Sequence, residues 1–391
     1  MPQHADRLDR IPPYLFGEIA ALKAQALAEG RDLVDLGIGD PDQPTPQPII
    51  DALARYANDP ATHRYDETPA GWTPFLETVT RWYERRFGVA LDPRSEALLL
   101  IGSKEGLAHL PWAFIEAGDL ALVPDPGYTV VKVNTLLAGG DVHEMPLLRE
   151  NGFLPLLDDI PSDVARRAEL IYLNYPNNPT GAVATLDFFR DVAAFARQYD
   201  ILVCHDCAYS EVYYDPADRP VSFLQAEGAK DVGLEMHSIS KTFNMTGWRV
   251  GWAVGNAEYV RALNRLKGNI DSRQFPALAM AAAYALDHPD LNEATLALYR
   301  RRRDIMVAGL RRLGFDVTAP RASFYLWVPV PAGATSADFA KKLLVEAGVL
   351  VIPGTGYGAH GEGYVRMSLT VPGDENGERV EEAVERLAKV L

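Results

Sequence analysis

The chain has 391 residues, of which 48% are apolar and 23% charged, and its formal net charge is −15. This composition is typical of a soluble globular protein, and the length favours two domains over one. The negative charge argues against a nucleic-acid partner, and neither a secretory signal nor an apolar run as long as a membrane span is expected.

Between residues 95 and 255, short apolar runs alternate with helical patterns. The runs expected to form strands are EALLLIGS, DLALVPDPG, DVHEMPL, AELIYLNYP, DILVCHD, LEMHSIS and WRVGWAVGN. The stretches between them, such as TLDFFRDVAAFARQYD, repeat apolar residues at intervals of three and four, as amphipathic helices do. This alternation predicts an α/β fold with a mostly parallel seven-stranded sheet, in which ligands bind at the carboxyl ends of the strands.

After Pro276 the pattern changes to a second, smaller α+β unit. Residues 277–313 are expected to be helical, with Gly314 as the stop. The segments FDVTAP, ASFYLWVPV, GVLVIPG and GYVRMSLT are expected to be strands, and SADFAKKLLVEAG a helix. We therefore predict a large domain over residues 50–285 and a discontinuous small domain over residues 1–49 and 286–391.

A lysine directly follows one predicted strand in SISKTFNMTGWRVGW, residues 238–252. Apolar walls around Lys241 would lower the pKa of its amine and free it for Schiff-base chemistry. Ser238 precedes this lysine and Arg249 follows it. Taken alone, the stretch does not distinguish such a lysine from an ordinary surface lysine.

Two further stretches place polar groups after strands. In LIYLNYPNNPTGA, the proline that follows Asn178 restrains the turn, so that the amide can point at a ligand oxygen. In IGSKEG, Ser103 and Lys104 open a helix whose free N–H groups can hold an anion, although the spacing is not that of a P-loop. A plain Asn-Pro turn and a simple helix cap explain these two stretches equally well.

The only two cysteines, Cys204 and Cys207, lie in CHDCAYSE. Alternation along the strand places Cys204 and Asp206 on one face and Cys207 on the other, which favours two small buried hydrophobes over a metal or redox pair. Two cysteines make no disulfide framework and fit a reducing cytoplasm. Asp206 ends a buried strand and needs a cationic partner, such as a protonated ring nitrogen, and Tyr209 can reach over the same crevice.

Together these stretches resemble the fold-type I, pyridoxal-phosphate-dependent class I/II aminotransferases, nearly from end to end. The characteristic spacing is that of Asn178, Asp206, Tyr209, Lys241 and Arg249. The resemblance implies that Lys241 forms a Schiff base with pyridoxal 5′-phosphate and that Asp206 pairs with its ring nitrogen. It also implies that Asn178 and Tyr209 donate hydrogen bonds to the ring phenolate oxygen, which lowers the pKa of the imine.

The same resemblance assigns the rest of the cofactor site. Tyr128, in PDPGYTVV, stacks on the ring. The phosphate-binding positions are Ser103, Lys104, Ser238 and Arg249. Tyr65, in HRYDETPAG, matches a tyrosine that reaches the phosphate of the other subunit, which implies a homodimer.

The resemblance also assigns substrate-binding positions, among which Asn178 is included. Arg366, in GEGYVRMSL, matches the arginine that binds the substrate α-carboxylate through a bidentate fork. Gly39, in DLGIGDPD, matches a glycine whose backbone approaches the same carboxylate.

The implied reaction is ping-pong transamination between an amino acid and a 2-oxo acid, with 2-oxoglutarate as the expected acceptor and Lys241 as the group that moves the proton. The phrases most like one branch, the LL-diaminopimelate aminotransferases of lysine biosynthesis, are DLGIGDPDQPTP, GSKEGLAHL, AYSEVYYD, SKTFNMTGWRVGWAVGN and GEGYVRMSL. Branches that act on aspartate, alanine, aromatic amino acids or succinyl-diaminopimelate share most of them. A carbon–sulfur lyase on the same scaffold is the alternative reaction class. A cofactor-binding regulator is disfavoured, since no basic helix-turn-helix segment precedes residue 30.

Two positions depart from that branch. Arg273, in NIDSRQF, stands where glycine is usual, and Leu76, in GWTPFLE, stands where arginine is usual. In this fold, residues near 273 lie close to the substrate pocket of the neighbouring subunit. Arg273 is therefore either a contact for a distal substrate carboxylate or a surface arginine at the dimer rim, and the physiological amino donor is left open.

Overall fold

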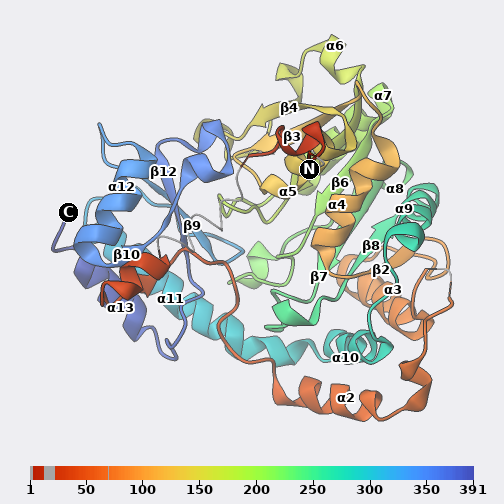
Figure 1. Ribbon diagram of the computed structural model, residues 1–391, viewed down its shortest axis with the longest axis horizontal. Coiled ribbons are helices and arrows are strands. Elements are labelled where there is room, and N and C mark those ends of the chain that lie inside the picture. The colour runs from red at the N-terminus through yellow and green to blue at the C-terminus, as the bar shows by residue number, and fades with distance from the viewer. Residues whose placement is uncertain (1–2, 13–22, 69) are drawn as a thin grey trace.

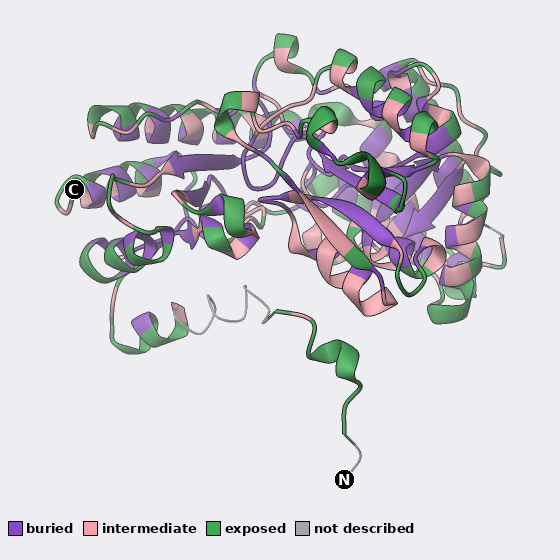
Figure 2. Cartoon of the chain, turned by 90° about the horizontal axis from the view of Figure 1, so that it is seen from above, coloured by how far each residue is buried: buried purple, intermediate pink, exposed green. Residues whose placement is uncertain are grey.

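The computed structural model describes residues 3–12, 23–68 and 70–391. Figure 1 shows a large group of helices around a twisted sheet, beside a smaller group that carries the C-terminus. Seen from above, most strands of the large sheet are buried between helices whose outer faces are exposed, while the strand at residues 141–146 is only partly buried (Figure 2). Among the residues described, no helix is long and apolar enough to cross a membrane.

The large sheet contains the seven strands expected from the sequence. They are β2 (Ala97–Leu100), β3 (Leu120–Asp125), β4 (Asp141–Pro146), β5 (Ala168–Asn174), β6 (Leu202–Asp206), β7 (Gly233–Ser238) and β8 (Gly251–Gly255). Their order is β2-β8-β7-β6-β5-β3-β4, and only β8 runs antiparallel to its neighbours. The prediction of a mostly parallel α/β sheet is therefore confirmed. Every residue of β6 and β7 is buried, polar residues included, so neither strand has a face exposed to solvent.

Helices connect and cover these strands. They are α2 (Gln47–Ala57), α3 (Thr73–Phe87), α4 (Ser103–Phe114), α5 (Thr129–Ala138), α6 (Ser162–Ala165), α7 (Leu186–Tyr199), α8 (Ala229–Val232), α9 (Ala257–Ile270) and α10 (Pro276–Asp287). Helix α7 illustrates the local rules. The side chain of Thr185 accepts the N–H of Phe188 at its start, and Asp200 ends it in the left-handed conformation.

The smaller group contains two short sheets and several helices, among them helical residues 23–28 at the edge of the described part of the chain. Its elements are β1 (Val34–Asp35), α11 (Glu293–Arg312), β9 (Tyr325–Pro329), α12 (Ser336–Lys342), β10 (Val349–Leu350), β11 (Ile352–Pro353), β12 (Tyr364–Ser368) and α13 (Glu378–Leu387). Strands β11, β12 and β9 form an antiparallel sheet, and β1 pairs in parallel with β10. Residues near 34 thus pack with the C-terminal part of the chain, as expected.

Two expectations for this region are wrong. The segment FDVTAP, residues 315–320, forms no strand, because its backbone groups are engaged locally. The N–H of Val317 bonds to the carbonyl of Phe315, and the guanidinium of Arg311 takes the Val317 carbonyl. The helical stretch 277–313 is also interrupted, since α10 ends at Asp287 and Pro289 follows before α11 begins.

Buried hydrophobic residues form one large cluster around the seven-stranded sheet and another around β9, β12, α11 and α13. The predicted division at residue 50 lies inside α2, whose Ile49 packs into the larger cluster. The domain ranges 50–285 and 1–49 with 286–391 stay a prediction. Residues 1–2 and 13–22 of the predicted small domain lie outside the described residues.

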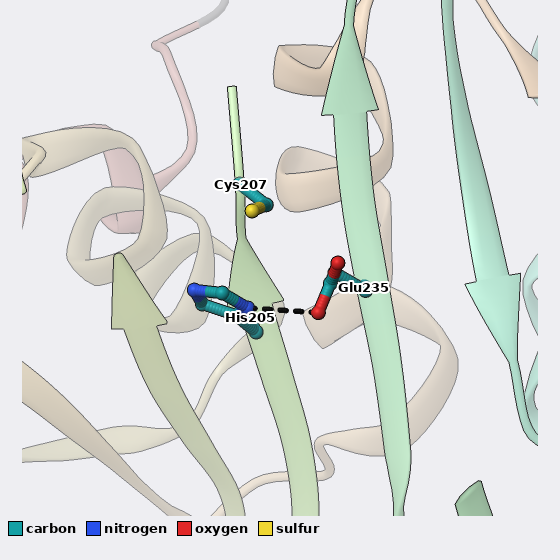
Figure 3. A group of neighbouring side chains, drawn as sticks. All are labelled: His205, Cys207 and Glu235. Atoms are coloured by element: carbon teal, nitrogen blue, oxygen red, sulfur yellow. Dashed lines mark hydrogen bonds and ion pairs between the residues drawn. The ribbon is translucent and has the colours of Figure 1, made fainter. Parts of the chain in front are cut away.

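Both cysteines are buried free thiols. Cys207 lies close to His205 and Glu235, as Figure 3 shows. His205 places Nδ1 3.0 Å from Glu235 and Nε2 2.9 Å from the carbonyl oxygen of Tyr175. Both ring nitrogens of His205 are therefore engaged by oxygen atoms of the chain itself. Burial also raises the pKa of the Cys207 thiol, so this sulfur is a neutral thiol beside a buried hydrogen-bonded histidine and glutamate.

Candidate active site

A pocket of about 310 Å³ opens where the parallel strands end. The predicted site residues that line it are Gly39, Ser103, Lys104, Tyr128, Asn178, Asp206, Tyr209, Ser238, Lys241, Arg249 and Arg366. Most of them directly follow the carboxyl end of a strand, which is where ligands bind in open α/β sheets. The structure therefore brings these positions together, while the individual role of each stays a prediction.

Lys241 lies just after β7, with its amine 2.8 Å from the carbonyl oxygen of Gly39. Desolvation by the pocket walls lowers the pKa of this amine to about 8, although the carboxylate of Asp40 opposes the shift. The nearby guanidinium groups of Arg366 and Arg249 lower it further. A lysine with this pKa has a sizeable free-base fraction near neutral pH, and the free base is the nucleophilic form.

Asp206 is the last residue of β6 and is buried. Burial raises the pKa of its carboxyl to about 6, against the lowering effect of His205. Its Oδ1 atom has no hydrogen-bond partner among the described residues. Asn174, at the end of the neighbouring strand, donates to the Asp206 backbone carbonyl at 2.9 Å and holds the strand ends in register. A buried carboxylate oxygen without a partner is suited to a cationic group of a ligand.

One end of the pocket is built for an anion. Helix α4 begins at Ser103, so its free N–H groups point towards the pocket that Ser103 lines. Gly102 has φ +75°, and a Cβ atom there would lie 2.3 Å from the guanidinium of Arg249. Arg249 is held in turn by the carbonyl of Thr246 at 2.9 Å. Because Gly102 has no side chain, the guanidinium of Arg249 can lie beside the helix terminus. The guanidinium and the free N–H groups of the helix together form an anion cradle that suits a phosphate.

Arg366 lies at the other end of the pocket, on β12, and is almost fully buried. Its Nη1 donates to Oδ1 of Asn178 at 2.9 Å and its Nη2 to the carbonyl of Gly37 at 2.5 Å. The guanidinium carbon also lies 4.2 Å from the ring centre of Tyr325 and 5.0 Å from that of Tyr357. Because the oxygen of Asn178 faces Arg366, its amide N–H group is the part that can donate to a ligand.

Two groups near the pocket were missed by the sequence reasoning. Tyr325 lines the pocket and places its hydroxyl 3.0 Å from that of Tyr209. Its only signal was a tyrosine in an apolar strand, where a buried hydroxyl requires a partner. Glu105 lies behind the anion cradle and accepts the N–H of Ile101 at 2.6 Å, while pairing with Lys267 at 3.0 Å. Nothing in the local pattern pointed to that pair.

Tyr65 lies outside this pocket. It is 84% exposed and lines a separate open groove together with Arg273. Arg273 donates to Oδ1 of Asn264 at 3.1 Å and to the carbonyl of Asp66 at 3.4 Å, so its guanidinium is engaged within its own chain. Leu76, the other unusual position, is buried in the large hydrophobic cluster, where an arginine would need a partner.

The pocket fits a flat aromatic aldehyde phosphate. The anion cradle suits the phosphate, the unpaired Asp206 oxygen suits a protonated ring nitrogen, and the Lys241 amine suits an aldehyde. The guanidinium of Arg366 remains for the carboxylate of a second ligand. Pyridoxal 5′-phosphate together with an amino acid carries the groups that complement this pocket.

Comparisons with known proteins agree with this chemistry. The family model for aminotransferase class I and II matches residues 31–387. An LL-diaminopimelate aminotransferase from Moorella thermoacetica is 53% identical over 390 residues, which cover 100% of this chain and 98% of the relative. A substrate-bound structure of BacF from Bacillus subtilis is 36% identical with a TM-score of 0.93, and covers 100% of this chain and 98% of its own.

A more distant structure has the same fold. The double mutant of aspartate aminotransferase from Thermus thermophilus is 29% identical with a TM-score of 0.91, and the match covers 100% of both chains. The chain therefore belongs to the aminotransferase class I and II family and is a fold-type I enzyme that transfers amino groups with pyridoxal phosphate.

Proposed function

We propose that this enzyme is an LL-diaminopimelate aminotransferase of lysine biosynthesis, with 2-oxoglutarate as the amino acceptor. The supporting observation is the 53% identity, over the whole chain, to the LL-diaminopimelate aminotransferase from Moorella thermoacetica. Identity to the Thermus thermophilus aspartate aminotransferase is only 29%, although the two folds superpose closely. Substrate choice within one fold depends on pocket residues, which diverge faster than the fold.

The cofactor, when bound, supplies an aldehyde for amines and a ring that accepts electron density from the substrate. In this proposal Asp206 keeps the ring nitrogen protonated through its buried carboxylate. Asn178 and Tyr209 donate to the phenolate oxygen. Tyr128 stacks on the ring. The residues that bind the phosphate are Ser103, Lys104, Ser238 and Arg249.

Lys241 has two tasks in the proposed reaction. Its free amine would hold the aldehyde group of the cofactor, and once released, Nζ would act as the base that takes the proton from the substrate Cα. The depressed pKa of Lys241, about 8, supports this role, because it gives the amine a far larger unprotonated fraction near neutral pH than an ordinary lysine has. The carbonyl of Gly39, 2.8 Å away, can orient the amine between the two steps.

Arg366 binds the substrate α-carboxylate in the proposed complex. Its contacts to Asn178, Gly37 and two aromatic rings hold the guanidinium plane before the substrate arrives. A guanidinium that is fixed in advance loses little conformational entropy on binding, and its fork matches a planar carboxylate. The backbone of Gly39 borders the same end of the pocket.

The enzyme is proposed to work as a homodimer. Phe275 lines the same groove as Tyr65 and is 40% exposed, and Ile270, five residues earlier in the chain, is 54% exposed. Such an exposed patch is typical of a subunit interface. Tyr65 would then reach the phosphate in the partner's pocket. We place the enzyme in the cytoplasm, since a reducing compartment keeps its two cysteines as thiols.

The proposal is tested with a panel of amino donors and 2-oxoglutarate, measuring glutamate formation. The panel contains LL-diaminopimelate, N-succinyl-LL-diaminopimelate, aspartate, alanine and phenylalanine. LL-diaminopimelate is expected to give the highest kcat/KM, because the value reports differential binding of the transition state. A higher kcat/KM for any other donor would assign the enzyme to that branch instead.

A further inference from the structure

Tyr325 is the first residue of β9 and has no role in the function as proposed so far. It pairs with Ser368 on β12, and two positions along, on the same face of the sheet, Trp327 pairs with Arg366. Residues directly opposite each other in an antiparallel sheet share a face, so Tyr325 and Arg366 are diagonal neighbours on one face. The register of two small-domain strands therefore aims the Tyr325 side chain into the pocket that it lines.

The hydroxyl of Tyr325 is closely confined. It lies 3.0 Å from the hydroxyl of Tyr209. On another side it meets the backbone of Gly39, where an added Cβ atom would lie 2.0 Å from the Tyr325 oxygen. One side chain thus contacts three positions to which the proposed function assigns roles, namely Gly39, Tyr209 and Arg366.

The two hydroxyls share one hydrogen bond, and its direction decides which hydrogen is left for the pocket. Burial raises the pKa of both phenols, so both are neutral near pH 7 and each can donate. The guanidinium of Arg366 lies over the Tyr325 ring and opposes the raised pKa of both phenols. If Tyr325 donates to the Tyr209 oxygen, the hydrogen of Tyr209 is left to turn towards the pocket.

The ring of Tyr325 has a separate effect. The Arg366 guanidinium carbon lies 4.2 Å from the ring centre, closer than the 5.0 Å to Tyr357 on the same guanidinium. An aromatic face attracts a desolvated cation and fixes the plane of the guanidinium. That plane decides whether both N–H groups can reach a carboxylate.

We propose that Tyr325 is a positioning residue of the reaction, whose hydroxyl orients the hydroxyl of Tyr209 and whose ring supports the guanidinium of Arg366. This inference rests on the proposed roles of those two residues. The hydroxyl and the ring of Tyr325 have different proposed roles, so two substitutions can test them independently.

The test uses the holoenzyme of Tyr325→Phe and Tyr325→Leu. One readout is the pH midpoint of the visible absorption of the bound cofactor, and the other is the Kd of glutarate, a dicarboxylate without an amine. Tyr325→Phe is expected to raise the midpoint by about 0.5 to 1 pH unit, since Tyr209 donates less well to the phenolate oxygen. Its Kd for glutarate should stay within about threefold, whereas Tyr325→Leu should raise that Kd about tenfold as the cation–π contact is lost.

Tyr357→Phe is the matched control. It also removes a buried hydroxyl next to Arg366 but keeps the ring, and that hydroxyl has no hydrogen-bond partner among the described residues. Its absorption midpoint should equal that of the parent. In a Tyr209→Phe background, Tyr325→Phe should add no further shift, because the hydroxyl acts only through Tyr209.

The outcomes separate this inference from the proposed function. If Tyr209→Phe shifts the midpoint and Tyr325→Phe does not, the hydroxyl part is wrong while the role of Tyr209 stands. If Arg366→Ala abolishes glutarate binding and Tyr325→Leu leaves it unchanged, the ring part is wrong. If neither Tyr209→Phe nor Arg366→Ala has an effect, the proposed site itself fails.

Discussion

The ammonium of Lys267 lies 3.0 Å from the carboxylate of Glu105 and 2.6 Å from that of Asp271, although only 1% of this lysine is exposed. Glu105 also accepts the N–H of Ile101, in the turn that leads into α4. The three charged groups therefore join the end of α9 to the start of α4, directly behind the anion cradle. In this way buried charges outside the pocket lining support the turn that is proposed to bind the phosphate.

Lys267→Met should loosen this turn and destabilise the fold. The substitution keeps the length of the side chain but leaves two carboxylates without their cation, which costs about 3–5 kcal/mol for a buried pair. We expect a lower free energy of unfolding in urea and a cofactor Kd raised about tenfold, measured by titrating the apoprotein. Lys230→Met is the control, because Lys230 pairs with Glu96 at 2.7 Å but is 40% exposed, and its loss should cost at most about 1 kcal/mol. Equal effects of the two substitutions would contradict this reading.

Asp206 should make the stability of the apoprotein depend on pH. Its pKa in the folded chain is about 6, above the ordinary value of 3.8, so the stabilisation is present at low pH and is lost as pH rises through 6. The loss between pH 4 and 7 should be about 2 kcal/mol. Asp206→Asn should remove this slope in urea unfolding of the apoprotein. The idea is wrong if parent and variant show the same dependence between these pH values.

Tyr65 and Lys241 should complement each other across the subunit interface. Lys241→Ala and Tyr65→Ala homodimers are each expected to be nearly inactive or to bind the cofactor weakly. After the two variants are unfolded and refolded together, about half of the dimers are mixed, and each mixed dimer holds one intact site, so activity should return to about a quarter of the parental value. If the mixture shows no more activity than its components, Tyr65 acts within its own chain or not at all.

Arg273 should influence the choice of donor only if it reaches the partner's substrate. Its guanidinium is occupied by Asn264 and the backbone of Asp66, and a substrate carboxylate would have to compete with these contacts. If the Arg273 guanidinium does reach the substrate in the partner's pocket, Arg273→Gly should lower kcat/KM for aspartate about tenfold relative to that for alanine. An unchanged ratio of the two values would leave Arg273 as a rim residue that stabilises the loop after α9.

Much of this protein was accessible from local patterns. Short apolar runs identified the strands of the large sheet, most of which are buried on both faces and have no solvent-facing side, the edge strand β4 being the exception. Lys241 and Asp206 could be placed at the ligand-binding edge, since each follows or ends such a strand, but their proposed roles came from the family resemblance. The prediction of a strand at FDVTAP was wrong because local sequence is not sufficient for a strand. Its residues suit a strand, but a strand also requires a partner edge, which local sequence does not reveal.

Other features were decided only by tertiary structure. Arg366 donates to the carbonyl of Gly37, 329 positions away, and Tyr325 meets Tyr209 only because the smaller sheet packs against the strand ends of the larger one. Propensity and periodicity act over about ten residues, so they determine what each segment becomes. Which distant groups then share a pocket depends on how buried surfaces fit together, and that fit is a property of the packed chain alone.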